Sequence, residues 1–545
     1  MKPTPNPSIP SLRRPLRSRA VAAACAFAML VSAGSPWAQG AGQNLGGTSS
    51  RPSASNSLPA LGDPEAEDFS VGTERKVGDQ IMREIRRDPD YVDDPILLEY
   101  LQSVWQPLVA EARARGNITA DIDSRFAWEP FLVRDPSINA FALPGGYMGV
   151  HLGLIAVTAT RDELASVLAH ELSHITQRHI ARSIASSKRQ SLLGLASLLV
   201  GVLAASRSRS PDAVNAVVAG TSAATLQGQL NFSRDMEREA DRVGMAVMTG
   251  AGFAPGGMAA MFEKLDKGSR LNDSGGFPYL RSHPLSIERV GEARSRLGTG
   301  PTVAAASVLE HTLAEARARV LMDTRLDALR RWQALDGDQV ASTLADKLLS
   351  AYSSALASTH LRDWSRADAS IATALALVRS APAPTARAER AVLMLQAESL
   401  LARGAAPRAA QLLQPYAAEN ARPILLAMTQ ITLAPSFNAD EKVLTARAAE
   451  LQTWVAVNPS DAAAWSDLAQ VWSRLGRPLR ALRAEAESRA GVGDLTGAVD
   501  RLRAGQRMAR GGGAVDFIDV SVIDARLRDI EAQRKAIAAD EKATR

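Results

Sequence analysis

Residues 167–174 read Val-Leu-Ala-His-Glu-Leu-Ser-His, and this stretch decides how the rest of the chain is interpreted. The pattern of residues 161–182 predicts one helix, with acidic residues in its first turn, where the helix dipole favours them. On a helix, His170 and His174 lie one turn apart and project from the same face. Two imidazoles placed in this way can hold one metal ion.

The residue between these histidines completes a catalytic pattern. Glu171 follows the first histidine and can reach a water on the metal, as in zinc peptidases. Zinc lowers the pKa of such a water from about 15.7 to about 7, and Glu171 can then take its proton as hydroxide attacks a peptide carbonyl. The alternative is a helix that shows two histidines by chance. Histidine is concentrated in this region, however, since five of the seven lie between residues 151 and 283. We therefore expect one zinc ion per chain.

Two histidines leave a catalytic zinc site one protein ligand short. Candidates lie in residues 233–241, Ser-Arg-Asp-Met-Glu-Arg-Glu-Ala-Asp. Glu237 and Asp241 are again one helical turn apart, so Glu237 can ligate zinc while Asp241 can hydrogen-bond a ligand histidine from behind. Glu239 points elsewhere on a helix, but helical geometry alone separates Glu237 from Glu239 only weakly.

These motifs carry a family resemblance. His-Glu-Leu-Ser-His followed by Glu-Arg-Glu-Ala-Asp resembles the zinc peptidase family that contains HtpX and the CAAX prenyl endopeptidases. In that family the first Glu of Glu-x-x-Ala-Asp is the third ligand, which implies Glu237. Residues 139–146 and Ser282-His-Pro284, with Arg289, are similar to its periplasmic BepA (YfgC) type. Members of that type join a signal peptide, this peptidase domain and C-terminal tetratricopeptide repeats.

The resemblance implies an α+β fold with a gluzincin-like zinc metallopeptidase domain, mostly helical with a small sheet. It also implies a role in the quality control of outer-membrane proteins, with both proteolytic and chaperone-like activity. The histidine that matches His283 can approach the zinc and occupy its open position, which would make the resting enzyme latent. Alternatively, His283 stabilises the oxyanion, or it is a structural residue before Pro284. The remaining histidines are interpreted as structural or exposed: His151, His179, His311 and His360.

The first 38 residues have the layout of a secretory signal peptide. They begin with basic residues, continue with an apolar run from Ala20 to about Ala33, and end in small residues. The apolar run is short for a membrane span. We expect cleavage after Ala38, with Ala33 as the alternative, and therefore a periplasmic protein.

Removal of this segment changes what the composition implies. The chain has 63 basic and 58 acidic residues, and residues 1–38 hold five basic and no acidic ones, which leaves 63 − 5 = 58 against 58. The remaining chain is formally neutral and gives no argument for nucleic acid as a partner. The single cysteine, Cys25, also lies in this segment, so disulfides are not expected.

Composition divides the rest of the chain. Residues 39–67 are rich in Gly, Ser, Pro and Asn and predict a flexible leader. Residues 68–302 are the expected peptidase domain, with strand patterns at residues 126–133, 138–143 and 147–150. Within it, residues 191–226 are interpreted as an apolar helical hairpin. This hairpin either rests on a membrane surface or covers the cleft, or else it is buried in the core.

Residues 303–545 are Ala-, Leu- and Arg-rich and predict an all-α domain. Small or aromatic residues recur there with spacings of seven and then five, which is typical of helix-turn-helix repeats of the tetratricopeptide kind. The alternative is an ordinary helical bundle. The recurring sets are Ala357, Trp364, Ala369; Ala397, Gly404, Ala409; Ala469, Gly476, Ala481; and Ala486, Gly493, Ala498.

The sequence therefore predicts a periplasmic zinc endopeptidase that acts on unfolded or stalled outer-membrane proteins and contacts their assembly machinery. Peripheral membrane contact is expected only if the hairpin rests on a membrane. The alternative is a non-proteolytic assembly chaperone or scaffold that uses the repeat domain and keeps a latent zinc site.

Overall fold

The computed structural model describes residues 69–186, 233–271, 278–297, 309–335, 343–383, 385–510 and 516–543. The expected signal peptide, leader and apolar hairpin lie outside these residues. Among the helices that are described, none combines the length and the apolar character that crossing a membrane requires.

A four-stranded mixed sheet lies beside the helix that carries the histidine motif. Its strands are β1 (Tyr91–Val92), β2 (Glu129–Val133), β3 (Ala140–Leu143) and β4 (Tyr147–His151), in the order β1-β2-β4-β3. Strands β2 and β4 are parallel, whereas β1 and β3 pair antiparallel with their neighbours. Three of these strands fall where the sequence predicts strands. The edge strand β3 contacts α6, the helix that carries the motif.

The turn between β3 and β4 depends on glycine. Gly145 and Gly146 have φ angles of 78° and 86°, a region that only glycine enters freely. A Cβ at Gly145 would lie 2.9 Å from the Cα of Arg75. The turn can therefore pack tightly against α2 (Val71–Ile85), and it returns the chain into β4.

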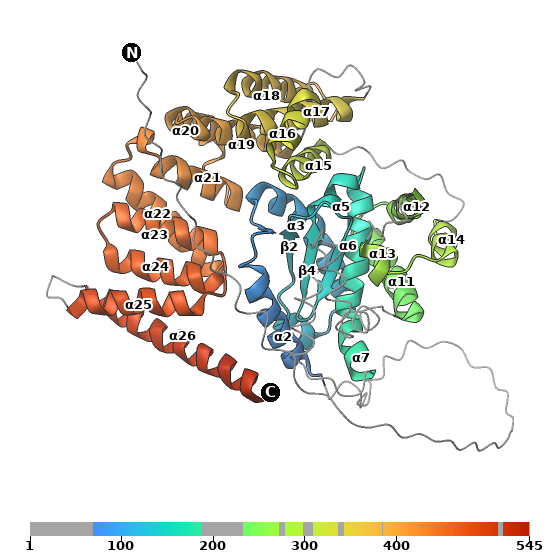
Figure 1. Ribbon diagram of the computed structural model, residues 1–545, viewed down its shortest axis with the longest axis horizontal. Coiled ribbons are helices and arrows are strands. Elements are labelled where there is room, and N and C mark those ends of the chain that lie inside the picture. The colour runs from blue at the N-terminus through green and yellow to red at the C-terminus, as the bar shows by residue number, and fades with distance from the viewer. Residues whose placement is uncertain are drawn as a thin grey trace, which may run out of the picture. The chain divides into compact units, whose positions relative to one another are not determined.

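Helices cover the sheet and surround α6. They are α3 (Pro95–Ala114), α4 (Ala120–Arg125), α5 (Leu152–Val157), α6 (Arg161–Thr176), α7 (His179–Ser186), α11 (Arg234–Gly250), α12 (Gly256–Leu271), α13 (Pro278–Ser282) and α14 (Ile287–Ser295). Helix α6 packs against α3, α11, α12 and β3, and Figure 1 shows it between the sheet and α11. Every residue of α6 from Glu163 to Thr176 is buried, so the histidine motif lies at the centre of this region.

The single helix predicted over residues 161–182 is wrong in one respect, because it is broken into α6 and α7. Arg178 lies at the break with a φ of 52°, in the left-handed region. Its guanidinium donates to Oε2 of Glu74 at 3.0 Å and to the backbone carbonyl of Phe69. These two contacts hold the turn and direct the first residue of α7, His179, back towards α6.

The C-terminal part is entirely helical in the residues that are described. Its α-helices are α15 (Leu309–Leu321), α16 (Leu326–Ala334), α17 (Leu344–His360), α18 (Trp364–Arg379), α19 (Ala386–Ala402), α20 (Ala406–Leu413), α21 (Arg422–Leu433), α22 (Glu441–Val457), α23 (Ala462–Arg474), α24 (Pro478–Gly491), α25 (Leu495–Arg510) and α26 (Phe517–Ala543). Two short 3₁₀ helices, Gln414–Tyr416 and Pro435–Phe437, lie on either side of α21. Most helices pack against the next helix in sequence. Gly404, Gly476 and Gly493, each with positive φ, lie in turns, whereas Trp364, the corresponding residue of the first recurring set, is the first residue of α18.

One apolar core joins the helices before and after the predicted domain boundary. Helix α15 packs against α3 and α5, and a single cluster of buried residues extends from Leu101 through Leu313 to Leu395. A buried ion pair reinforces this contact, because Arg317 on α15 pairs with Asp94, the residue that caps α3, at 2.7 Å. The start of α3 is therefore fixed to the C-terminal helices.

Candidate metal centre

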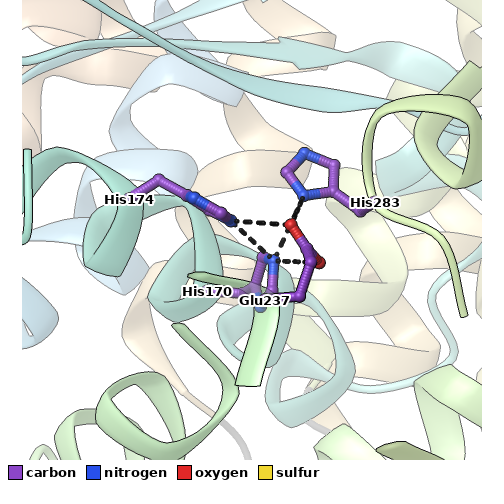
Figure 2. Close-up of side chains that lie close together, drawn as sticks. All are labelled: His170, His174, Glu237 and His283. Atoms are coloured by element: carbon purple, nitrogen blue, oxygen red, sulfur yellow. Dashed lines mark hydrogen bonds and ion pairs between the residues drawn. The ribbon is translucent and has the colours of Figure 1, made fainter. Parts of the chain in front are cut away.

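Four side chains from three separate segments converge at one buried point. They are His170 and His174 from α6, Glu237 from α11, and His283 directly after α13. One potential ligand atom from each residue lies within 4.8 Å of the others, and all four residues are buried. Figure 2 shows the three rings and the carboxylate pointing towards one another.

Helix α6 sets the two motif histidines face to edge. The rings of His170 and His174 have centroids 4.7 Å apart, and their Nε2 atoms are 3.0 Å apart. Thr160 caps this helix by accepting a hydrogen bond from the backbone amide of Glu163. The predicted one-turn spacing is therefore realised with both Nε2 atoms on the same side.

Helix α11 brings Glu237 to the histidines. Oε1 of Glu237 lies 3.4 Å from Nε2 of His174, and Oε2 lies 3.5 Å from Nε2 of His170. Helix α11 approaches α6 closely at Gly244, where a Cβ would lie 3.0 Å from the carbonyl oxygen of Ala169. A larger residue there would push the two helices, and hence the carboxylate and the histidines, apart.

His283 completes the group from the other side. Its Nδ1 lies 3.0 Å from Oε1 of Glu237 and 3.3 Å from Nε2 of His170. Burial raises the pKa of Glu237, but the interactions with His283, His170 and His174 lower it by more. The net pKa therefore lies well below the usual range. Glu237 is therefore ionised, as a metal ligand must be.

Asp241 and Arg289 support the first ligand histidine from behind. Oδ1 of Asp241 lies 2.9 Å from Nδ1 of His170, which fixes the plane of the imidazole. Arg289 in turn holds Asp241 with two hydrogen bonds, from Nε at 2.6 Å and from Nη2 at 2.8 Å. Burial raises the pKa of Asp241, but Arg289 and His170 outweigh it, and the net pKa is lowered.

Glu171 lies beside the ligand group and is not a member of it. It is fully buried, its Oε2 accepts a hydrogen bond from the backbone amide of Ala142 on the edge strand β3 at 3.1 Å, and its Oε1 lies 3.3 Å from Nε2 of His283. Burial raises the pKa of Glu171. A buried carboxylate with a raised pKa, next to a metal site, is suited to act as a general base.

A fourth histidine, His179, lies behind His174, although the sequence alone assigns it no role in the site. Nδ1 of His179 is 2.8 Å from Nδ1 of His174, and its Nε2 is 3.1 Å from Oε2 of Glu239. Burial lowers the pKa of His179 to about 4. The only signal in the sequence is a histidine five residues after the motif. That signal becomes meaningful once the helix break between α6 and α7 is known.

The other histidines lie outside the centre. His151 is buried and contacts Oγ of Ser137, His311 lies between the hydroxyl of Tyr100 and the carbonyl of Thr158, and His360 is exposed. Glu239 is also outside the group of possible ligands.

The residues present fit a zinc ion. Three imidazoles and one carboxylate are ligands that zinc prefers. Oε1 of Glu171 is buried and accepts no hydrogen bond from the residues that the structure describes, which is costly unless a cation or water meets it. Oε2 of Glu237 already meets the guanidinium of Arg289 at 2.8 Å. His170, His174 and Glu237 would hold the ion, and His283 is placed to be a fourth ligand.

A helix that carries His-Glu-x-x-His, next to a carboxylate from a second helix, defines a zinc metallopeptidase domain. Residues 99–297 match peptidase family M48, so this part of the chain is a metallopeptidase domain of that family.

Relatives extend the similarity beyond this domain. The chain is 34% identical over 316 residues to a putative beta-barrel assembly-enhancing protease of Vibrio cholerae, covering 57% of this chain and 62% of the relative. It is 34% identical over 264 residues to the beta-barrel assembly-enhancing protease of Escherichia coli, covering 48% and 52%. It is also 30% identical over 197 residues to the mitochondrial metalloendopeptidase OMA1 of Saccharomyces cerevisiae, covering 35% and 53%. The matched part thus spans about half to three fifths of the length of these relatives.

Proposed function

We propose that this protein is a periplasmic zinc endopeptidase that degrades unfolded or stalled outer-membrane proteins and assists their assembly. The buried group of His170, His174 and Glu237 beside Glu171 is the observation that carries the proposal. Two bacterial relatives named for beta-barrel assembly support the substrate class. The basic and apolar pattern of residues 1–38 supports export.

In this proposal the chemistry is divided among the residues of the site. A bound zinc ion supplies Lewis acidity to a water molecule and to the peptide carbonyl. Glu171 takes the proton of the attacking water on Oε1 and passes it to the leaving amine. Asp241 keeps His170 oriented, and the amide of Ala142 holds the second oxygen of Glu171 in place. The site is buried, so these charges act in a poorly solvated environment, where they are strong.

The C-terminal helices would supply the surface for partners. We interpret residues 303–545 as degenerate tetratricopeptide-like repeats, because their turns fall at the spaced residues Gly404, Gly476 and Gly493. Stacked helix pairs create extended concave surfaces that bind other polypeptides. This surface would hold a client or a component of the assembly machinery, and it would also carry the chaperone-like activity.

Digestion of an unfolded outer-membrane β-barrel protein tests the function. The zinc-loaded protein should cleave this client, and removal of zinc with a chelator should abolish cleavage until zinc is restored. The same outer-membrane protein in its folded state is the matched control, and it should not be cleaved. If the protein does not cleave the client, but its zinc-free form suppresses aggregation of the client, the chaperone alternative is favoured instead. In that alternative His283 would be the fourth ligand that keeps the zinc site latent.

His283 is proposed to hold the resting enzyme latent. With His170, His174 and Glu237 it could close the zinc coordination, as in a structural site, which leaves no position for water. We expect His283→Ala to raise basal cleavage while zinc stays bound. If the fourth ligand stabilises the closed form by about 1.4 kcal/mol, the increase is about tenfold. Cleavage of an unfolded client and zinc content measure the two effects.

Ser282→Ala is the matched control for this change, because it alters the adjacent residue without touching the ligand group. The control should cleave like the unaltered protein. A fall in activity with zinc retained would make His283 a residue that stabilises the transition state, and the latency proposal would then be wrong.

A further inference from the structure

We propose that His179 is a positioning residue for the metal centre, because it accepts a hydrogen bond from the ligand His174 and is itself held by Glu239. This inference rests on the proposed role of His174 as a zinc ligand. It assigns a support to the second ligand histidine, just as Asp241 supports the first.

Zinc binding by Nε2 of His174 would fix the direction of each hydrogen bond. Nε2 of His174 faces the other ligands, 3.0 Å from Nε2 of His170, so it must be the nitrogen without a proton when it binds the metal. The proton of His174 therefore lies on Nδ1, and Nδ1 of His179 lies 2.8 Å away, where it can accept this proton in a hydrogen bond. His179 then carries its own proton on Nε2, which donates to Oε2 of Glu239 at 3.1 Å.

The chain of contacts ends at the surface. Nη1 of Arg182 donates to the same Oε2 of Glu239 at 2.9 Å. The side chains of His174 and His179 are both 0% exposed, that of Glu239 is 29% exposed and that of Arg182 is 47% exposed. The inner contact is therefore shielded from water, while the outer one is partly solvated. Loss of His179 should consequently weaken the centre more than loss of Glu239.

The fold builds this support from α11, which already serves the site, and from α7, which follows the motif helix α6. Glu239 is on α11, the helix that supplies Glu237, and His179 begins α7 directly after the break at Arg178. If residues 161–182 formed one straight helix, positions 174 and 179 would be about 140° apart around the axis and could not face each other. The helix break is thus what allows the contact.

A role in positioning makes a prediction that a role in packing does not. His179→Phe keeps a ring of similar size but removes both nitrogens, so Nδ1 of His174 loses the acceptor that lies 2.8 Å away. Loss of such a partner typically weakens metal binding 10- to 100-fold. His179→Asn puts an amide oxygen close to the position of Nδ1, so it should recover most of the zinc affinity. Glu239→Ala should give an intermediate loss, and Glu239→Gln, which keeps an acceptor oxygen, a smaller one.

The test measures zinc affinity in the full chain by competition with a chromophoric chelator. Thermal unfolding of the metal-free protein and the absorption spectrum of the cobalt-substituted protein are recorded alongside. Ser183→Ala, one turn further along α7, is the control. We expect weaker zinc binding and a changed cobalt spectrum in His179→Phe, a recovered affinity in His179→Asn, and similar metal-free unfolding temperatures in both.

Wild-type zinc affinity in His179→Phe, or equal losses in the Phe and Asn variants, would overturn the inference. A lower metal-free unfolding temperature with unchanged zinc affinity would show a role in packing only. If His179→Phe does not fold, the comparison of Glu239→Ala with Glu239→Gln decides, because equal zinc affinities there would also overturn it. Failure of the unaltered protein to bind zinc would instead overturn the proposed function itself, so the two failures are distinguishable.

Discussion

Replacement of Glu171 with Gln is expected to reduce cleavage of an unfolded client by about 100- to 10,000-fold, the usual contribution of a positioned general base. The amide keeps the size of the side chain, and it can still accept the hydrogen bond from Ala142. It cannot take a proton from water. Because Glu171 is not among the grouped ligands, zinc content should stay near one ion per chain. Client digestion and metal analysis on the same preparation measure both effects.

Glu163→Gln is a useful comparison for Glu171→Gln, since Glu163 is also buried on α6 but lies two turns away from the centre. It should leave turnover largely intact. Near-normal cleavage by Glu171→Gln would contradict the proposed mechanism. Loss of zinc in that variant would show that Glu171 is a ligand.

The second large effect is expected for Glu237→Ala. This change removes the only carboxylate of the ligand group and one of the two carboxylates that pair with Arg289, the other being that of Asp241. Zinc affinity should fall by more than the roughly 10- to 100-fold that is typical when an outer partner of a ligand is lost. Chelator competition measures the dissociation constant, and no cleavage should remain at limiting zinc.

Glu239→Ala is the matched control on the same helix, two residues further on. Because Glu239 contacts His179 and no ligand of the group directly, its loss should cost less zinc affinity than loss of Glu237. Equal zinc retention by the two variants, or the reverse order, would show that the third ligand has been wrongly assigned.

The spacing of residues along single helices is enough to predict part of the metal centre. The spacing of His170 and His174 determines their common face as soon as residues 161–176 are helical, and the same rule places Asp241 one turn from Glu237. The choice between Glu237 and Glu239 is different. It depends on which face of α11 meets α6, and only the three-dimensional structure shows that Glu237, and not Glu239, joins the group of possible ligands.

Long-range contacts explain what the sequence could not predict. The break after α6 requires Glu74 and Phe69 to bind Arg178, and neither lies nearby in sequence. The sequence alone predicts a structural or exposed role for His179, because the helix break brings it to His174 and Glu239 only in the folded chain. Composition and local spacing predict the all-helical character after residue 303, which the described residues have, but the core that joins Leu101 with Leu313 depends on packing between distant segments.

The burial of charged groups around the ligands has a consequence for folding. Glu171, Glu237 and Asp241 are buried together with a single guanidinium, that of Arg289. With all three carboxylates ionised and the histidines neutral, as zinc ligands are, this set carries a formal charge of −3 + 1 = −2. An unbalanced double charge in the interior opposes compaction, so the metal-free site has to take up protons, for example on His170. Burial lowers the pKa of His170, but its hydrogen bonds to Asp241 and Glu237 raise it by more. A divalent cation, in contrast, cancels the charge directly. Binding of the ion and folding of the chain are then linked equilibria, so a zinc-starved compartment would hold less of the folded protein as well as less of the active one.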